Sequence, residues 1–241
     1  MNGRRLTLVA LLGFALGAAT LAAGLRVREH FTRVIWMAGA PPLDASLHAR
    51  RVSQFAASKA TPRIVMLGDS RVQEAEWNEL LGRTDVVNRG IAGDTTSGLF
   101  ARLGQSVPPS AAVCVIQVGY NDLLQQNPLD QVEQNFRAIL GKLAASERPP
   151  RVLLTPVILS GDASGSLNAR IAAVNSTLRQ IATERHAGWL DLNEKLCPHG
   201  SLDRAWTNDR AHLNGAAYEI IAAALKPRLT ELAPSSPAST E

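Results

Sequence analysis

The stretch RIVMLGDSRVQ, residues 63–73, decides the fold class of this sequence. Ile64 to Leu67 form an uninterrupted apolar run, which is typical of a strand buried inside a parallel sheet. The run ends on a glycine, an acid, a hydroxyl and a guanidinium within four residues, Gly68 to Arg71. We interpret this pattern as a buried strand that stops at the edge of a sheet and presents Ser70 in a tight turn.

Further apolar runs alternate with segments of helical spacing over about 170 residues. This alternation predicts an α/β fold in which helices cover both faces of a parallel sheet, a three-layer α/β/α sandwich. The other expected strands are Asp85–Asn88, Ala112–Val118, Val152–Pro156 and Trp189–Leu192. The expected helices are Glu74–Leu81, Thr95–Leu103, Leu129–Ala145, Leu167–Glu184 and Ala216–Leu225, the last interrupted by Pro227.

The N-terminal segment has the composition of a membrane-targeting element. Leu6 to Leu25 carries no charge over 20 residues and follows Arg4 and Arg5. About 20 apolar residues span a bilayer, so we favour an uncleaved signal anchor over a cleaved signal peptide or a buried helix. We expect an envelope protein, periplasmic or otherwise extracytoplasmic, that is anchored in the inner membrane or secreted. The expected parts are an anchor or signal at 1–28, a juxtamembrane segment and entry helix at 29–60, the folded domain at 61–232 and a disordered tail at 233–241.

The distribution of charge argues against nucleic-acid binding. The net charge is +4, and residues 1–50 account for all of it, with six arginines against two acids. Residues 51–241 hold 19 basic and 19 acidic side chains. The basic excess therefore flanks the apolar segment, as is typical of membrane-targeting segments. The folded domain has no excess of positive charge with which to bind a nucleic-acid backbone.

Four polar clusters follow expected strands or precede the last helix. They are GDS at 68–70, NRGIAGDTT at 88–96, VGYND at 118–122 and TNDRAHLNG at 207–215. Parallel strands bind ligands beyond their carboxyl ends, where the strand order reverses. We therefore expect these separate stretches to meet at one edge of the sheet.

Together the clusters contain the parts of an acyl-transfer site. Ser70 offers a hydroxyl that needs a base, and His212, with Asp209 three residues before it, fits the base and the acid that orients it. Gly93 allows close backbone approach, so its N–H can face a developing oxyanion. The Asn121 amide and the Ser70 N–H are the other expected donors of an oxyanion hole.

These four blocks, in this order, resemble the SGNH hydrolases, also called GDSL-type esterases and lipases. Over residues 48–226 the resemblance is strongest to the branch related to platelet-activating-factor acetylhydrolase subunits and bacterial acylhydrolases. It implies a flavodoxin-like five-stranded sheet of order 2-1-3-4-5 and an active site that needs no metal. Residue by residue, it implies Ser70 as nucleophile, Gly93 and Asn121 in the oxyanion hole, and Asp209 and His212 as the other triad members.

Two residues depart from the family pattern. Arg71 stands where an apolar residue is common, and we weigh a structural ion pair against a contact with substrate. Arg210 stands where the family commonly has glycine; if that glycine has a positive φ, the arginine should adopt another turn. Trp206, close to the triad loop, is the aromatic residue expected to line the pocket. We expect no metal or other cofactor, because the remaining histidines lack ligand spacing: His30, His48, His186 and His199.

The expected function is hydrolysis of carboxylic esters through an acyl-enzyme, with short acyl groups implied by the family branch. The substrate is then a small-molecule, lipid or carbohydrate ester. Acyl transfer to a sugar or another alcohol uses the same residues and stays an alternative. A membrane-tethered binding module without catalysis is a third possibility, against which the intact Ser70, Asp209 and His212 count.

Overall fold

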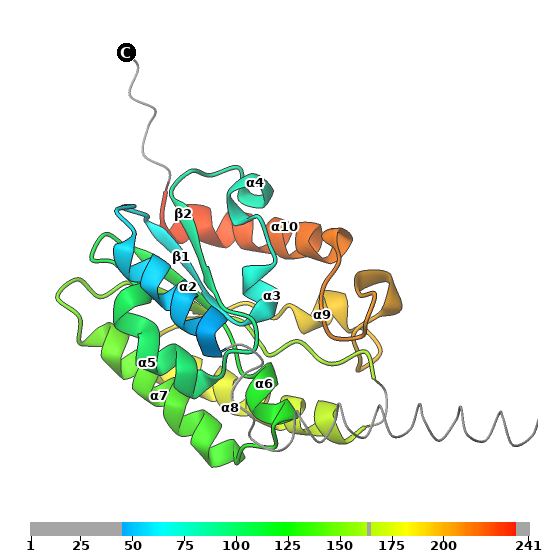
Figure 1. The fold of residues 1–241 in the computed structure, drawn as a ribbon. Helices are drawn as coiled ribbons and strands as arrows, with labels where there is room; N and C mark the ends of the chain where they lie inside the picture. The colour runs from blue at the N-terminus through cyan, green and yellow to red at the C-terminus, as the bar shows by residue number, and fades with distance from the viewer. Residues whose placement is uncertain (1–44, 163–164, 235–241) are drawn as a thin grey trace, which may run out of the picture. The chain divides into compact units, whose positions relative to one another are not determined.

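A five-stranded parallel sheet forms the centre of the protein (Figure 1). The computed structural model describes residues 45–162 and 165–234. The strand order is β2-β1-β3-β4-β5, which confirms the predicted order. Because β1 lies between β2 and β3, the order reverses at β1, and this is where parallel sheets bind ligands. The strands are β1 (Ile64–Gly68), β2 (Val86–Gly90), β3 (Val113–Gln117), β4 (Arg151–Leu154) and β5 (Gly188–Trp189).

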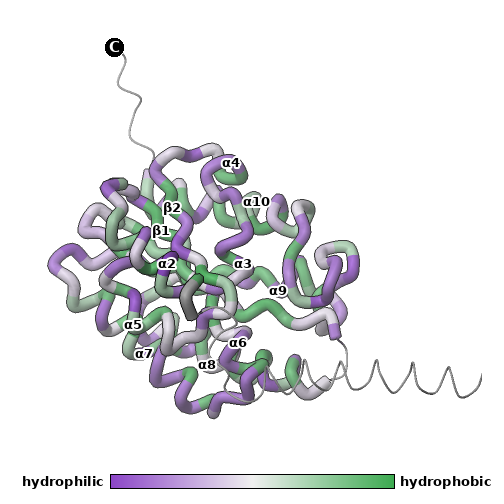
Figure 2. The backbone as a smooth tube through the Cα atoms, viewed as in Figure 1, coloured by the Kyte–Doolittle hydropathy of each residue, from purple (hydrophilic) through white to green (hydrophobic). Residues whose placement is uncertain are grey.

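Both faces of the sheet are buried, because side chains that alternate along each strand enter two separate hydrophobic clusters. Ile64 and Met66 of β1 enter one cluster, and Val65 and Leu67 enter the other. The first cluster is covered by α4 (Trp77–Leu81) and α10 (Gly215–Leu232). The second is covered by α5 (Thr96–Ser106), α7 (Leu129–Ala144) and α8 (Ser166–Glu184). The hydropathy of the backbone trace shows apolar segments in the sheet and polar ones in the outer loops (Figure 2).

The last helix is longer than predicted. It runs to Leu232 with Pro227 inside it, so the predicted interruption at Pro227 is wrong. The carbonyl that loses its partner is that of Ala223, four residues earlier, and both residues lie on the exposed face. Leu225 and Leu229 are buried on either side of the proline and hold the two halves against the sheet.

The helix predicted over Glu74–Leu81 starts only at Trp77, as α4, so its predicted start is wrong; a separate short helix, α3 (Ser70–Gln73), comes before it. Asn88 of β2 explains the break. Its Nδ2 donates to the main-chain carbonyls of Val72, Gln73 and Ala75 at 2.9, 3.0 and 3.0 Å. Main-chain carbonyls that accept hydrogen bonds from a side chain are not available for the regular hydrogen bonds of an α-helix, so the helix is interrupted here.

Several short elements were not predicted: α6 (Tyr120–Leu124), α9 (Asn193–Leu196) and a 3₁₀ turn at Arg204–Trp206. The expected entry helix is present as α2 (Ala45–Ala57), which packs beside α5. Within residues 45–162 and 165–234, no helix is both long and apolar enough to cross a membrane. The predicted anchor or signal segment at 1–28 and most of the predicted tail at 233–241 lie outside the described residues.

Candidate active site

Ser70 lies at the carboxyl end of β1 and begins α3. Asp69 caps this helix, since its Oδ1 accepts the Arg71 N–H at 3.1 Å. Asp69 is 2% exposed. Burial raises the pKa of Asp69 to about 6, against the opposing attraction of Arg71. The turn thus fixes the Ser70 main chain from within the fold.

The loop before α10 brings His212 to Ser70, although 142 positions separate the two residues. His212 Nε2 lies 3.1 Å from Ser70 Oγ, and Nδ1 lies 2.6 Å from Asp209 Oδ2. The other carboxylate oxygen of Asp209 accepts the N–H groups of Ala211 and His212 at 2.9 and 2.7 Å. The three predicted triad residues therefore form one hydrogen-bonded chain, with the carboxylate oriented by its own turn.

The contacts of Asp209 favour its ionised form. Desolvation by the surrounding chain opposes ionisation, but hydrogen bonds from the His212 ring and from the main-chain N–H groups outweigh it and lower the pKa of Asp209. A charged carboxylate can hold the imidazole in one tautomer and stabilise the imidazolium.

Arg210, between Asp209 and His212, adopts the left-handed conformation that favours glycine, with φ 71°. The expectation that arginine would adopt another turn is therefore wrong. Two hydrogen bonds hold the Arg210 carbonyl: it accepts from the Gly161 N–H at 2.8 Å and from Ser160 Oγ at 3.4 Å. A Cβ on Gly161 would lie 3.1 Å from the Arg210 Cβ, so this close approach depends on glycine. The loop after β4 thus holds the strained turn in place.

The predicted oxyanion donors lie on three neighbouring loops. Gly93 has φ 76°, and the space beside its Cα is open, as close approach of a ligand requires. Asn121, in α6 after β3, is 7% exposed, and its Nδ2 donates to the Asp94 carbonyl at 2.8 Å. This bond uses one of the two amide hydrogens and leaves the other for a ligand. Within the described part of the chain, no residue accepts from the Ser70 or Gly93 N–H.

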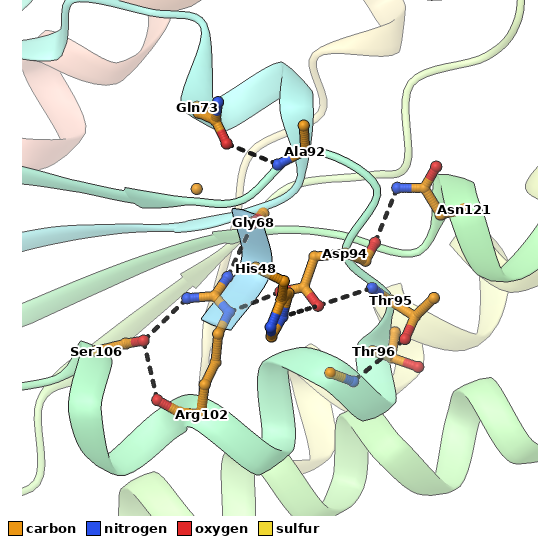
Figure 3. A network of polar contacts seen from close by, with 12 residues as sticks. His48, Gly68, Gln73, Ala92, Asp94, Thr95, Thr96, Arg102, Ser106 and Asn121 are labelled. Carbon is orange, nitrogen blue, oxygen red and sulfur yellow. Dashed lines mark hydrogen bonds and ion pairs between the residues drawn. The ribbon is translucent and has the colours of Figure 1, made fainter. Parts of the chain in front are cut away.

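Asp94 holds the loop that carries Gly93 through a buried network of polar contacts (Figure 3). Its Oδ2 pairs with Arg102 Nε at 2.7 Å, and its Oδ1 accepts the Thr95 N–H at 3.0 Å. Arg102 in turn donates to the Gly68 carbonyl at 3.0 Å, just ahead of the Ser70 turn. His48 Nε2 of α2 lies 3.4 Å from the Asp94 carboxylate. Asp94 therefore ties this loop, through Arg102, to α5 and to the end of β1.

Arg71 is 3% exposed and turns inward. Its guanidinium donates to the main-chain carbonyls of Ala211 and Ile158, and no described carboxylate pairs with it directly. The predicted ion pair is therefore wrong, and the burial argues against the predicted contact with substrate.

Trp206 is half-buried and packs against the cluster that contains Leu213 and Tyr218, so its place in a substrate pocket stays a prediction.

Sequence reasoning missed Glu74, whose Oε1 lies 3.8 Å from His212 Nε2. Glu74 follows Ser70 by four residues, about one helical turn, and this spacing could have indicated that its side chain lies near Ser70. The two side chains are 43% and 46% exposed, so solvent weakens their attraction.

Among the described residues, no group of three or more His, Cys, Asp or Glu side chains is arranged to hold a metal ion.

Comparisons with known proteins show the family of the chain. The model of the GDSL-like lipase/acylhydrolase family matches residues 66–220. Platelet-activating factor acetylhydrolase IB subunit alpha2 of Rattus norvegicus is 25% identical over 184 residues, 73% of this chain and 80% of the relative.

Solved structures share the fold. A GDSL-like lipase from Bacteroides thetaiotaomicron has a TM-score of 0.68 at 20% identity, over 76% of this chain and 97% of that one. A catalytic mutant of an acetylxylan esterase from Geobacillus stearothermophilus has a TM-score of 0.58 at 22% identity, over 71% and 94%. Since the family model covers well over half of the sequence, the chain belongs to the GDSL-like lipase/acylhydrolase family of ester hydrolases.

Proposed function

We propose that the protein is a serine esterase that cleaves short-acyl carboxylic esters through an acyl-enzyme on Ser70. The observation that carries this proposal is the hydrogen-bonded chain from Ser70 Oγ through His212 to Asp209, with distances of 3.1 and 2.6 Å. A serine hydroxyl is a weak nucleophile until a base removes its proton, and His212 Nε2 is within reach of that proton.

In the first half-reaction, His212 Nε2 takes the proton of Ser70 as Oγ bonds to the ester carbonyl carbon. The carbonyl oxygen becomes an oxyanion, which accepts hydrogen bonds from the Ser70 and Gly93 N–H groups and from the free amide hydrogen of Asn121. His212 then gives its proton to the leaving alkoxide as the ester C–O bond breaks. Ionised Asp209 stabilises the imidazolium that exists between these two proton transfers.

In the second half-reaction, water replaces the alcohol. His212 takes a proton from water as the water oxygen attacks the acyl carbon, and it returns this proton to Ser70 Oγ when the acyl-enzyme breaks down. The side chains of Asp209 and His212 are 53% and 46% exposed, so water reaches the base readily. This exposure favours hydrolysis over transfer of the acyl group to another alcohol, which requires that water be kept out.

The preference for short acyl groups rests on similarity to relatives named acetylhydrolase and acetylxylan esterase. For a series of p-nitrophenyl esters, we expect kcat/KM to be highest for acetate and to fall through butyrate, octanoate and dodecanoate. A maximum at octanoate or dodecanoate would contradict short-acyl specificity and leave the esterase assignment intact.

We also propose that the hydrolase domain lies outside the cytoplasm, anchored or exported by the N-terminal segment. The proposal rests on the 20 uncharged residues from Leu6 to Leu25. In cells that produce the full chain, we expect protease added to spheroplasts to digest the domain. Protection of the domain until the cells are lysed would place it in the cytoplasm and refute the proposal.

A further inference from the structure

The side chain of Arg71 lies at the centre of the loops that form the site. Its Nε donates to the Ala211 carbonyl at 2.8 Å, and its Nη1 donates to the Ile158 carbonyl at 2.7 Å. The guanidinium carbon lies 3.9 Å from the centre of the Tyr120 ring, which is cation–π distance. One side chain thus touches the loops after β3 and β4 and the loop before α10.

Two of these contacts, those with Ala211 and Tyr120, adjoin a residue of the proposed reaction. Arg71 directly follows Ser70, Tyr120 directly precedes Asn121, and Ala211 directly precedes His212. Because the Ala211 carbonyl lies in the rigid peptide plane that Ala211 shares with His212, a group that holds this carbonyl limits where His212 can lie. Stacking on the Tyr120 ring limits the movement of α6, which also carries Asn121.

The backbone of Arg71 is itself fixed. Its N–H donates to Asp69 Oδ1 at 3.1 Å, and its carbonyl accepts the Tyr218 hydroxyl at 2.9 Å. Tyr218 is buried and packs edge-on against Trp77, with ring centres 6.0 Å apart. The main chain of Arg71 is therefore held in place, and the hydrogen bonds of its guanidinium fix the other loops relative to it.

The choice of arginine is not explained by packing alone. A buried charge loses its hydration, and the Arg71 Nη2 is buried without a hydrogen-bond partner among the described residues. An apolar side chain would fill the same space without that cost. The flat guanidinium does what an apolar side chain cannot, since it donates in two fixed directions while one face stacks on an aromatic ring.

We propose that Arg71 is a positioning residue that sets His212 and Asn121 relative to Ser70. The proposal rests on the proposed function, because it concerns the geometry of that reaction. Misplacement of reacting groups by about 1 Å can cost about 100-fold in rate without a direct contact to substrate. Loss of the guanidinium should therefore lower kcat and leave KM nearly unchanged.

The test compares Arg71→Ala and Arg71→Lys with the wild type, using p-nitrophenyl acetate. We expect kcat to fall about 100-fold in R71A and about 10-fold or more in R71K, since an ammonium group cannot donate along both fixed directions and stack. Millimolar guanidinium chloride should restore part of the kcat of R71A, and ammonium chloride at equal ionic strength should not. Arg83→Ala is the matched control: Arg83 also donates to a main-chain carbonyl, that of Ala233, but lies before β2 at the far end of the sheet.

The outcomes separate the two proposals. Unchanged kcat in R71K, a loss confined to KM, or a fall in R71A that guanidinium does not reverse would each overturn the positioning role while the esterase assignment stands. If R71A does not fold, the kcat of R71K and of Tyr120→Leu, which removes the stacking ring, decides the matter by the same criteria. A wild type that hydrolyses no ester would refute the proposed function, and the positioning role with it.

Discussion

Replacing Ser70 by alanine is expected to lower kcat for ester hydrolysis by on the order of 10⁵-fold or more, and His212→Ala is expected to cause a similar loss. The reason is geometric, since His212 Nε2 lies 3.1 Å from Ser70 Oγ and is the proposed acceptor of its proton. Without either group, the nucleophile is absent or remains protonated. The double variant should lose little more than each single variant, because the two residues act as one unit.

Steady-state kinetics with p-nitrophenyl acetate measures these losses. Ser146→Ala and His199→Ala are suitable controls, because Ser146 donates to the Leu143 carbonyl at the end of α7 and His199 is exposed in the chain after α9. Both controls should keep wild-type kcat. Hydrolysis retained in S70A would reassign the nucleophile, and additive losses in the double variant would show that His212 does not act on Ser70.

Asn121→Ala is expected to lower kcat by about 10²–10³-fold with little change in KM, the usual cost of removing one oxyanion donor. The amide of Asn121 is preoriented, because the Asp94 carbonyl accepts one of its hydrogens at 2.8 Å. Asp94 is in turn held by Arg102 (Figure 3). A donor fixed in this way stabilises the oxyanion without reorganisation, so its removal should act on the transition state more than on substrate binding.

The matched control is Asn135→Ala. Asn135 Nδ2 also donates a single hydrogen bond, to Thr96 Oγ1 at 2.9 Å, but it lies on α7 behind the oxyanion loop. We expect N135A to keep kcat within a few-fold. A loss in N121A confined to KM, or one no greater than in N135A, would remove Asn121 from the oxyanion hole.

Much of the fold could be predicted because the informative signals are local. Buried parallel strands appear as apolar runs, and the polar residues that follow them mark the edge of the sheet where chemistry is possible. Ser70 stands in such a cluster, and Asp209 and His212 stand in the polar cluster before the last helix, which is why residues far apart in sequence could be expected to meet. The cap at Asp69 and the bond from the Thr95 N–H to Asp94 are local in the same sense, since each joins residues close in sequence.

The features that were missed depend on contacts between distant segments. The break between α3 and α4 arises from Asn88 on β2, and the helix through Pro227 persists because its unpaired carbonyl faces solvent. Nothing local to Arg71 indicates that its guanidinium reaches Ile158 and Ala211, 87 and 140 residues away. The strained φ of Arg210 likewise depends on Ser160 and Gly161, which come from another loop.

Covalent labelling by a fluorophosphonate tests most directly whether Ser70 is the activated nucleophile. The wild-type protein should take up one label per chain, and mass spectrometry of the digested protein should locate it on Ser70. Labelling should be absent in S70A and strongly slowed in H212A. Label on a different serine, or equal labelling rates in the wild type and H212A, would contradict the proposed coupling of Ser70 to His212.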